Sequence, residues 1–212
     1  MDVSHPIRGI IPTLDAPVIE VLAGTTRALT GREVQRLAGT GSVRGVQLVL
    51  ARLVGQGLVI ADEHANATLY VANRAHLAWP MLDDLVGVRN RLLDGLREIV
   101  AGWAIGPLHV SLFGSAARRD GDASSDIDLL IVRPDDVAEG DEGWATQIDG
   151  LRDRVVAWTG NRCQAFDLDR TRLGEHLAAG DPLVESWLRD EILLAGEPLR
   201  TLIDSVAVAG RS

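Results

Sequence analysis

The stretch that most constrains the fold runs from Leu108 to Val132 and contains two strand-like segments around a polar turn. Leu108, Val110 and Leu112 alternate with the residues between them, which predicts a strand that ends at Gly114. The apolar run that ends at Val132 predicts a second strand. Because glycine adopts backbone angles that other residues resist, we expect a tight turn between the two strands.

Two carboxylates, Asp126 and Asp128, open the second strand. Side chains alternate along a strand, so both aspartates project from one face and Ile127 projects from the other. Two carboxylates on one face are costly unless a cation lies between them, and Mg²⁺ prefers oxygen ligands next to substrate phosphates. With the Ser115 hydroxyl beside the turn, the pattern predicts a site for Mg²⁺ and phosphate. The alternative is a strand edge with two solvated aspartates.

This stretch resembles the nucleotidyltransferase superfamily of DNA polymerase beta, in its minimal nucleotidyltransferase branch. The resemblance lies in Gly114-Ser115, followed after ten further residues by Asp-x-Asp. The resemblance implies that Asp126 and Asp128 bind Mg²⁺. It also implies four contacts to the nucleoside triphosphate: Gly114, Ser115, Arg118 and Ser125. Relatives commonly have glycine after the arginine of this turn, where this chain has Arg119.

A third strand is predicted over residues 162–168, and the superfamily carries its third carboxylate on such a strand. Asp167 lies within this strand between two apolar residues, as the resemblance implies for that acid. Asp169 lies at the strand exit, where aspartate commonly caps a following helix. We therefore assign Asp167 as the third metal ligand and catalytic acid, with Asp169 as the alternative. By resemblance, this acid helps to deprotonate the attacking hydroxyl.

Composition excludes several classes of protein and suggests a domain boundary. The 212 residues include a single cysteine, Cys163, which excludes an internal disulfide and a cysteine-based zinc cluster. Without a signal peptide or an apolar run near 18 residues, we expect a cytoplasmic protein. Residues 1–80 carry seven arginines against six acids, whereas residues 81–212 carry 14 against 24. This shift indicates a boundary near Pro80, which gives domains of residues 1–78 and 79–212.

Residues 13–75 are predicted to form helices followed by a hairpin. Helices are expected over residues 14–22 and 31–37, the latter after a capping box formed by Thr30 and Glu33. Ser42 begins a third helix that ends near Gly55, and a hairpin follows. This order of elements resembles the winged helix-turn-helix domains of bacterial transcription regulators.

If this domain binds DNA, the start of the third helix faces the major groove with Ser42, Arg44 and Gln47, and Arg52 contacts phosphate. The hairpin tip, however, carries Asp62 and Glu63, and the domain is nearly neutral. Because phosphate contacts supply most non-specific DNA affinity, a protein-contact or dimerisation module is favoured over a DNA-binding one.

The remaining segments complete an α+β fold in which a mixed sheet is flanked by helices. Apolar spacing predicts a linking helix over residues 76–103 with a break or a start near Pro80, and a helix over residues 144–158. The segment 171–206 is expected to form two or three short helices.

The predicted function is Mg²⁺-dependent transfer of a nucleoside monophosphate, AMP from ATP, to a hydroxyl acceptor. By resemblance, minimal nucleotidyltransferases are often antitoxins that modify a tyrosine of a partner toxin, and others modify aminoglycosides. A protein acceptor is favoured because no extra domain for a small molecule is visible. The alternative is a DNA-binding regulator whose transferase-like domain binds nucleotide without turnover. Acceptor, nucleotide and oligomeric state stay open at this point.

Overall fold

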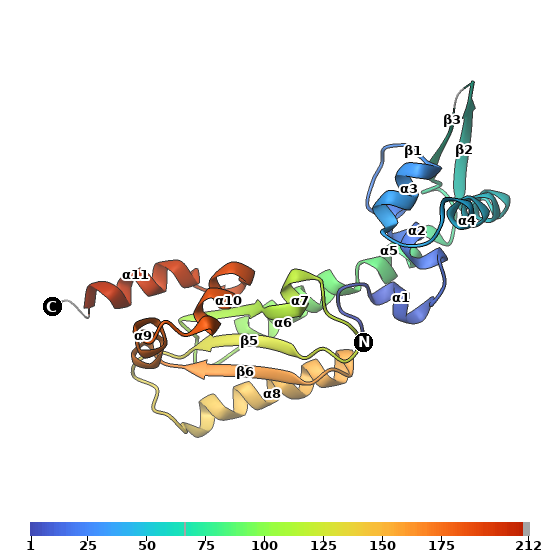
Figure 1. Ribbon diagram of the computed structural model, residues 1–212. Coiled ribbons are helices and arrows are strands. Elements are labelled where there is room, and N and C mark those ends of the chain that lie inside the picture. Colours follow the sequence, from blue (N-terminus) through green and yellow to red (C-terminus); the bar gives the residue numbers. More distant parts are fainter. Residues whose placement is uncertain (66, 210–212) are drawn as a thin grey trace. The chain divides into compact units, whose positions relative to one another are not determined.

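The computed structural model describes residues 1–65 and 67–209 (Figure 1). The chain divides into two compact units. His5–Arg89 form the small unit, and Met1–Ser4 together with the chain from Asn90 onward form the large unit. Helices and a mixed sheet confirm the predicted α+β class.

The small unit packs its helices around a three-stranded antiparallel sheet with the strand order β1-β3-β2. Its elements are α1 (Pro6–Ile10), α2 (Asp15–Ala23), β1 (Leu29–Thr30), α3 (Gly31–Ala38), α4 (Val43–Gly55), β2 (Val59–His64), β3 (Ala67–Ala72) and α5 (Trp79–Val86). The predicted capping box begins α3: the Thr30 hydroxyl accepts from the Glu33 amide, and the Glu33 carboxylate accepts from the Thr30 amide. Ser42 caps α4 by accepting from the amide of Gly45.

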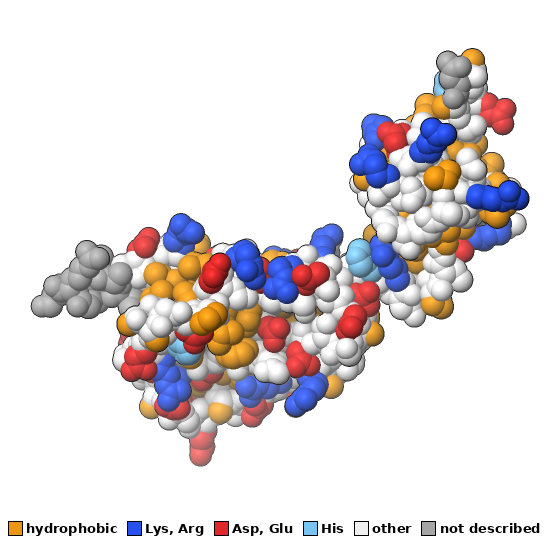
Figure 2. All heavy atoms as spheres, in the orientation of Figure 1, with side chains coloured by type: hydrophobic (Ala, Val, Ile, Leu, Met, Phe, Trp, Pro, Cys, Tyr) orange, Lys and Arg blue, Asp and Glu red, His pale blue; other side chains and the backbone are white. Residues whose placement is uncertain are grey.

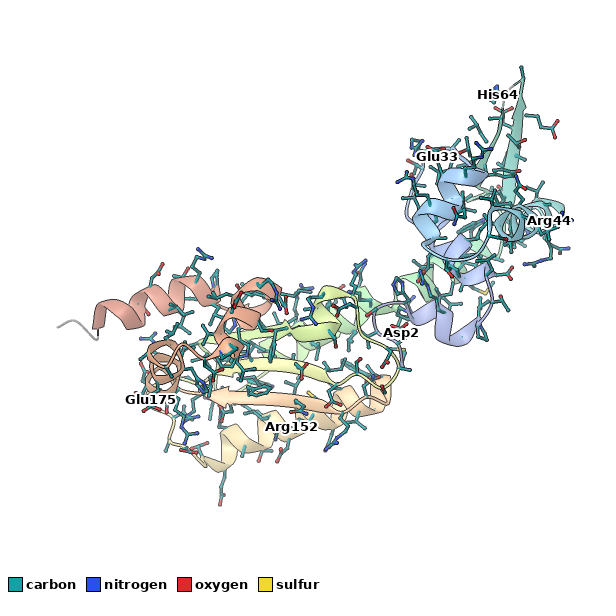
Figure 3. The ribbon with its side chains drawn as sticks, viewed as in Figure 1. Asp2, Glu33, Arg44, His64, Arg152 and Glu175 are labelled. Atoms are coloured by element: carbon teal, nitrogen blue, oxygen red, sulfur yellow. The ribbon has the colours of Figure 1, made fainter. Side chains whose placement is uncertain are left out.

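The large unit is built on a four-stranded sheet with the order β6-β5-β4-β7, in which only β5 and β6 are parallel. Its elements are α6 (Val88–Ala101), β4 (His109–Phe113), α7 (Gly114–Arg118), β5 (Ile127–Val132), α8 (Glu142–Thr159), β6 (Cys163–Leu168), α9 (Arg170–Ala178), α10 (Pro182–Asp190), β7 (Ile192–Gly196) and α11 (Leu199–Ala209). The guanidinium of Arg152 on α8 donates to the carbonyl of Ala165 at 3.3 Å, so α8 lies along β6 (Figure 3).

Strand β5 divides its side chains between two hydrophobic cores, as alternation requires. Ile127, Leu129 and Ile131 pack with apolar side chains of α6 and α8. Leu130 and Val132 pack with those of α9, α10 and α11. The sheet therefore has one face covered by α6 and α8 and another covered by the C-terminal helices.

Several elements differ from the prediction. The linking helix starts at Trp79, as expected near Pro80, but a break at Gly87 that was not predicted divides it into α5 and α6. The C-terminal segment contains strand β7 between its helices, because a run as short as Ile192–Gly196 does not separate strand from helix by periodicity. Helix α1 and strand β1 were not predicted, for the same reason of length. Over residues 1–65 and 67–209, no helix is both long and apolar enough to cross a bilayer.

Candidate active site

The turn after β4 is built around Gly114, the first residue of α7. Gly114 has a φ of +71°, which side chains of L-residues rarely adopt. A Cβ atom added here would lie 2.7 Å from Oδ2 of Asp128, because Phe113 and Asp128 are paired between β4 and β5. Both constraints require glycine. They place the turn backbone directly against the Asp128 carboxylate.

The two predicted carboxylates lie together at the start of β5. Asp128 is half-buried within the strand, and Asp126 comes just before it. Burial raises the pKa of Asp128 and the charge of Asp126 raises it further, whereas Arg118 opposes the shift. The site therefore holds two mutually repelling carboxylates whose repulsion a bound cation would relieve.

The predicted third carboxylate, Asp167, is not part of this cluster. In the parallel ladder Asp128 pairs with Gln164, so Asp167, three residues further along β6, lies on the opposite face of the sheet. There its Oδ1 accepts from Nε1 of Trp144 at 3.1 Å, and its Oδ2 lies 3.3 Å from the Arg133 guanidinium. This placement contradicts the prediction that Asp167 is a metal ligand and catalytic acid of the site.

The alternative, Asp169, is a helix cap, as its place at the strand exit indicated. Its Oδ1 accepts from the amide of Arg172 at 2.7 Å, and its Oδ2 accepts from Arg133 at 2.8 Å. The Arg133 side chain is 2% exposed and lies between Asp167 and Asp169 at the ends of β5 and β6. The ion pairs of the buried Arg133 with these two acids form a structural network rather than a ligand set.

Gln164 is the residue of β6 that reaches the carboxylate of Asp126. Its Nε2 donates to Oδ2 of Asp126 at 2.8 Å. Gln164 had no predicted role, since a lone glutamine matches no catalytic or metal-binding pattern. The signal that finds it is the register between β5 and β6, which the sequence does not provide.

The serines predicted to bind nucleotide lie on either side of Gly121. A Cβ added at Gly121 would approach Oγ of Ser125 to 3.0 Å and Oγ of Ser115 to 3.1 Å. Ser125 is also fixed by its neighbour, because its Oγ accepts from the amide of Asp122 at 2.9 Å. The structure thus brings the two hydroxyls to the same loop, next to Asp126.

Arg118 is held by two carboxylates rather than freely solvated. Its Nε donates to Asp120 at 2.9 Å, and Nη1 donates to Asp190 at 2.5 Å. The Asp190 side chain is 1% exposed. Hydrogen bonds from Arg189 and from Arg118 lower the pKa of Asp190 to about 2. Asp190, at the end of α10, was missed because its contact with α7 spans 72 positions of sequence.

The carboxylates of the site fit a divalent cation that also binds a substrate. Within residues 1–65 and 67–209, no three His, Cys, Asp or Glu side chains are grouped so as to hold a metal ion. Asp126 and Asp128 nevertheless offer carboxylate oxygens next to the Gly114 turn. Mg²⁺ is commonly bound by one or two carboxylates together with substrate phosphates and water.

Residues 90–178 match the family model of the nucleotidyltransferase domain. The matched residues include the Gly114 turn, Asp126, Asp128, and β6 with Gln164. The chain therefore carries a nucleotidyltransferase domain, and nucleotidyltransferases generally use divalent metal ions.

Two solved structures are similar to part of this chain. One is a toxin–antitoxin complex with AMP-PNP, at 12% identity and a TM-score of 0.37, over 56% of this chain and 86% of that one. The other is a mutant of the toxin–antitoxin complex MntA-HpeT, at 11% identity and a TM-score of 0.36, with the same coverage. No curated protein matches the chain.

Proposed function

We propose that the large unit transfers a nucleoside monophosphate, AMP from ATP, to a hydroxyl acceptor in a reaction that requires Mg²⁺. The observation that carries this proposal is the contact between the Gly114 turn and Asp128, with Asp126 beside it, inside the matched domain. A glycine turn that lies directly against a pair of carboxylates suits a metal-bound triphosphate, whose cation the carboxylates would hold.

In this proposal the chain supplies charge and position rather than covalent chemistry. Asp126 and Asp128 would hold the cation, which neutralises phosphate charge when bound. Ser115 is placed to donate its hydroxyl hydrogen to a phosphate oxygen from the loop around Gly121. The Ser125 hydroxyl donates to Oδ1 of Asp122 at 3.2 Å, so it would exchange this bond for one to phosphate. Nucleotidyl transfer is an in-line attack on the α-phosphorus that releases pyrophosphate, so correct placement of the triphosphate contributes most of the catalysis.

Arg118 is proposed to stabilise the leaving pyrophosphate. Its guanidinium is held at the edge of the turn by Asp120 and Asp190. A fixed guanidinium contributes more than a mobile one because its geometry is set before the charge develops. Asp190 is thus a positioning residue that acts through Arg118.

We place the acceptor hydroxyl on a protein, such as a partner toxin. Residues 81–212 carry 24 acidic residues against 14 arginines, and this excess of negative charge favours a basic partner. A cationic aminoglycoside is the alternative with the same charge complementarity.

The test is incubation of the chain with labelled ATP, Mg²⁺ and the product of the neighbouring gene. We expect labelled acceptor protein, and a loss of at least about 100-fold in Asp128→Asn, since that change removes a metal carboxylate. Asp153→Asn removes an exposed acid of α8 and should keep full activity. Full activity of Asp128→Asn would refute the site. Nucleotide binding without transfer to any acceptor would support the non-catalytic regulator instead.

For the small unit we propose a winged-helix module that contacts protein. Support comes from the order α2, β1, α3, α4 and hairpin, and from the strand order β1-β3-β2. On α4, Arg44, Gln47 and Leu48 are exposed, and Leu48 is 64% exposed. Figure 3 labels Arg44, and Figure 2 shows basic and hydrophobic side chains together on the visible face of the small unit. Exposed apolar side chains on this helix, Leu48 and Val43, favour a protein partner.

DNA binding through the same face is less well supported. Arg52, the predicted phosphate contact, forms an ion pair with Asp15. The hairpin exposes Asp62 and Glu63. A salt-dependent shift of a promoter fragment would establish DNA binding, and Arg44→Ala should abolish that shift. Crosslinking through a cysteine placed at Leu48 to a protein partner, without any DNA shift, would support the protein-contact proposal.

A further inference from the structure

The face of the sheet that carries Asp126 and Asp128 receives one polar side chain from the neighbouring strand, and that side chain is an amide. Gln164 is the register partner of Asp128, and its Nε2 donates to Asp126 at 2.8 Å. β6 is the edge strand of the sheet. A side chain at position 164 is therefore placed to complete a ligand set with the two aspartates.

The acids nearest in sequence to Gln164 are unavailable for that role. Asp167 and Asp169 both bind Arg133, and Asp167 lies on the other face of the sheet. The described residues contain no third acidic, histidine or cysteine ligand close to the pair. The site thus presents two negative charges where a third carboxylate at position 164 would give three.

We propose that Gln164 stands in place of a third carboxylate, so that the free site binds a divalent cation weakly and binds it tightly only together with the triphosphate. This inference rests on the proposed function. The amide holds one oxygen of Asp126 by its hydrogen bond and adds no charge. The phosphates of the nucleotide then supply the negative charge that the protein lacks, which makes cation and nucleotide binding strongly cooperative.

The geometry also predicts the effect of restoring the charge. A carboxylate at position 164, within hydrogen-bond distance of Asp126, would repel the pair in the free protein and attract a divalent cation. The repulsion between the carboxylates is present with and without the ion, so the change in affinity comes from the attraction between the added charge and the cation. Gln164→Glu should therefore bind Mn²⁺ without nucleotide about tenfold more tightly. Gln164 is exposed, so the substitution is tolerated by the fold.

The experiment is a Mn²⁺ titration of the full chain by calorimetry, without nucleotide and with a non-hydrolysable ATP analogue. In the unsubstituted chain we expect the analogue to tighten Mn²⁺ binding by at least about 100-fold. Gln164→Glu should already bind Mn²⁺ about tenfold more tightly without nucleotide, so the analogue should tighten Mn²⁺ binding about tenfold less in this variant than in the unsubstituted chain. Ala157→Glu adds the same charge on α8, behind the other face, and should behave like the unsubstituted chain.

Substitution of Asp126 separates failure of this inference from failure of the proposed function. Asp126→Asn should weaken Mn²⁺ binding both alone and when combined with Gln164→Glu. If Asp126→Asn has no effect on Mn²⁺ affinity, the proposed metal site itself fails. If Asp126→Asn weakens binding but Gln164→Glu does not strengthen it, the metal site stands and the role of Gln164 is refuted. Stronger Mn²⁺ binding by Ala157→Glu to the same extent would also refute it.

Discussion

Replacing Gly114 by alanine tests the contact on which the candidate site depends. Two costs apply. A non-glycine residue in the left-handed region costs about 1–2 kcal/mol, and Gly114 has a φ of +71°. The new Cβ would also lie 2.7 Å from Oδ2 of Asp128, so the carboxylate must turn away at a cost of about 0.5–1.5 kcal/mol.

The chain offers a matched control in Gly160, which ends α8. Its φ is also +71°, and an added Cβ meets nothing within 4 Å. Gly160→Ala should therefore lose only the backbone contribution, about 1–2 kcal/mol of the free energy of unfolding. Gly114→Ala should lose that amount and about 0.5–1.5 kcal/mol more. The difference between the two variants isolates the contact with Asp128.

Urea denaturation followed by tryptophan fluorescence measures these losses, because Trp103, Trp144, Trp158 and Trp187 all lie in the large unit. Transfer activity should separate the variants further. A displaced Asp128 costs on the order of 100-fold in rate, whereas Gly160→Ala should retain its activity. Equal stability losses in the two variants, with full activity in Gly114→Ala, would refute the argument.

Three further substitutions test the surrounding contacts. Arg119 has a φ of +65°, so Arg119→Gly should stabilise the chain by about 0.5–1 kcal/mol in urea denaturation; a loss of stability would contradict this. Asp190→Asn should cost about 1–3 kcal/mol at pH 7 because the buried bond to Arg118 weakens. As the pKa of Asp190 is lowered to about 2, its contribution is present above about pH 4 and lost as the pH falls toward about 2, so acid titration should show the two proteins converging. Arg133→Met should cost about 3–5 kcal/mol, partly recovered when Asp167→Asn is added; absence of recovery would refute the ion pair.

The local part of the site was predictable from the sequence because it lies within one continuous stretch. Alternation placed Asp126 and Asp128 on one face, and the glycine after a strand predicted the turn at Gly114. Both features follow from backbone geometry over short stretches of chain. The α+β class and most of the elements were predictable for the same reason, since each has its own periodicity.

The contribution of β6 was not predictable, because it depends on register. A shift of one residue exchanges the two faces of a strand, so the choice between Gln164 and Asp167 rests entirely on which residue pairs with Asp128. The apolar neighbours of Asp167 suggested a buried metal ligand. They are equally suitable for an acid that binds Trp144 and Arg133. Long-range contacts such as that between Arg118 and Asp190 are likewise absent from any local pattern.

Arg119 stands where the resemblance implies glycine, and Gln164 lies beside the carboxylate pair without a predicted role; the two residues have different consequences. Arg119 keeps the left-handed backbone that glycine would adopt more easily, so the turn retains its shape and only stability is reduced. Gln164 keeps the backbone of β6 but changes the charge that faces Asp126. Substituting Arg119 should therefore alter the free energy of unfolding with little effect on cation affinity. Substituting Gln164 should alter cation affinity with little effect on the free energy of unfolding. A variant that changed both quantities together would show that the turn and the carboxylate pair are not separable.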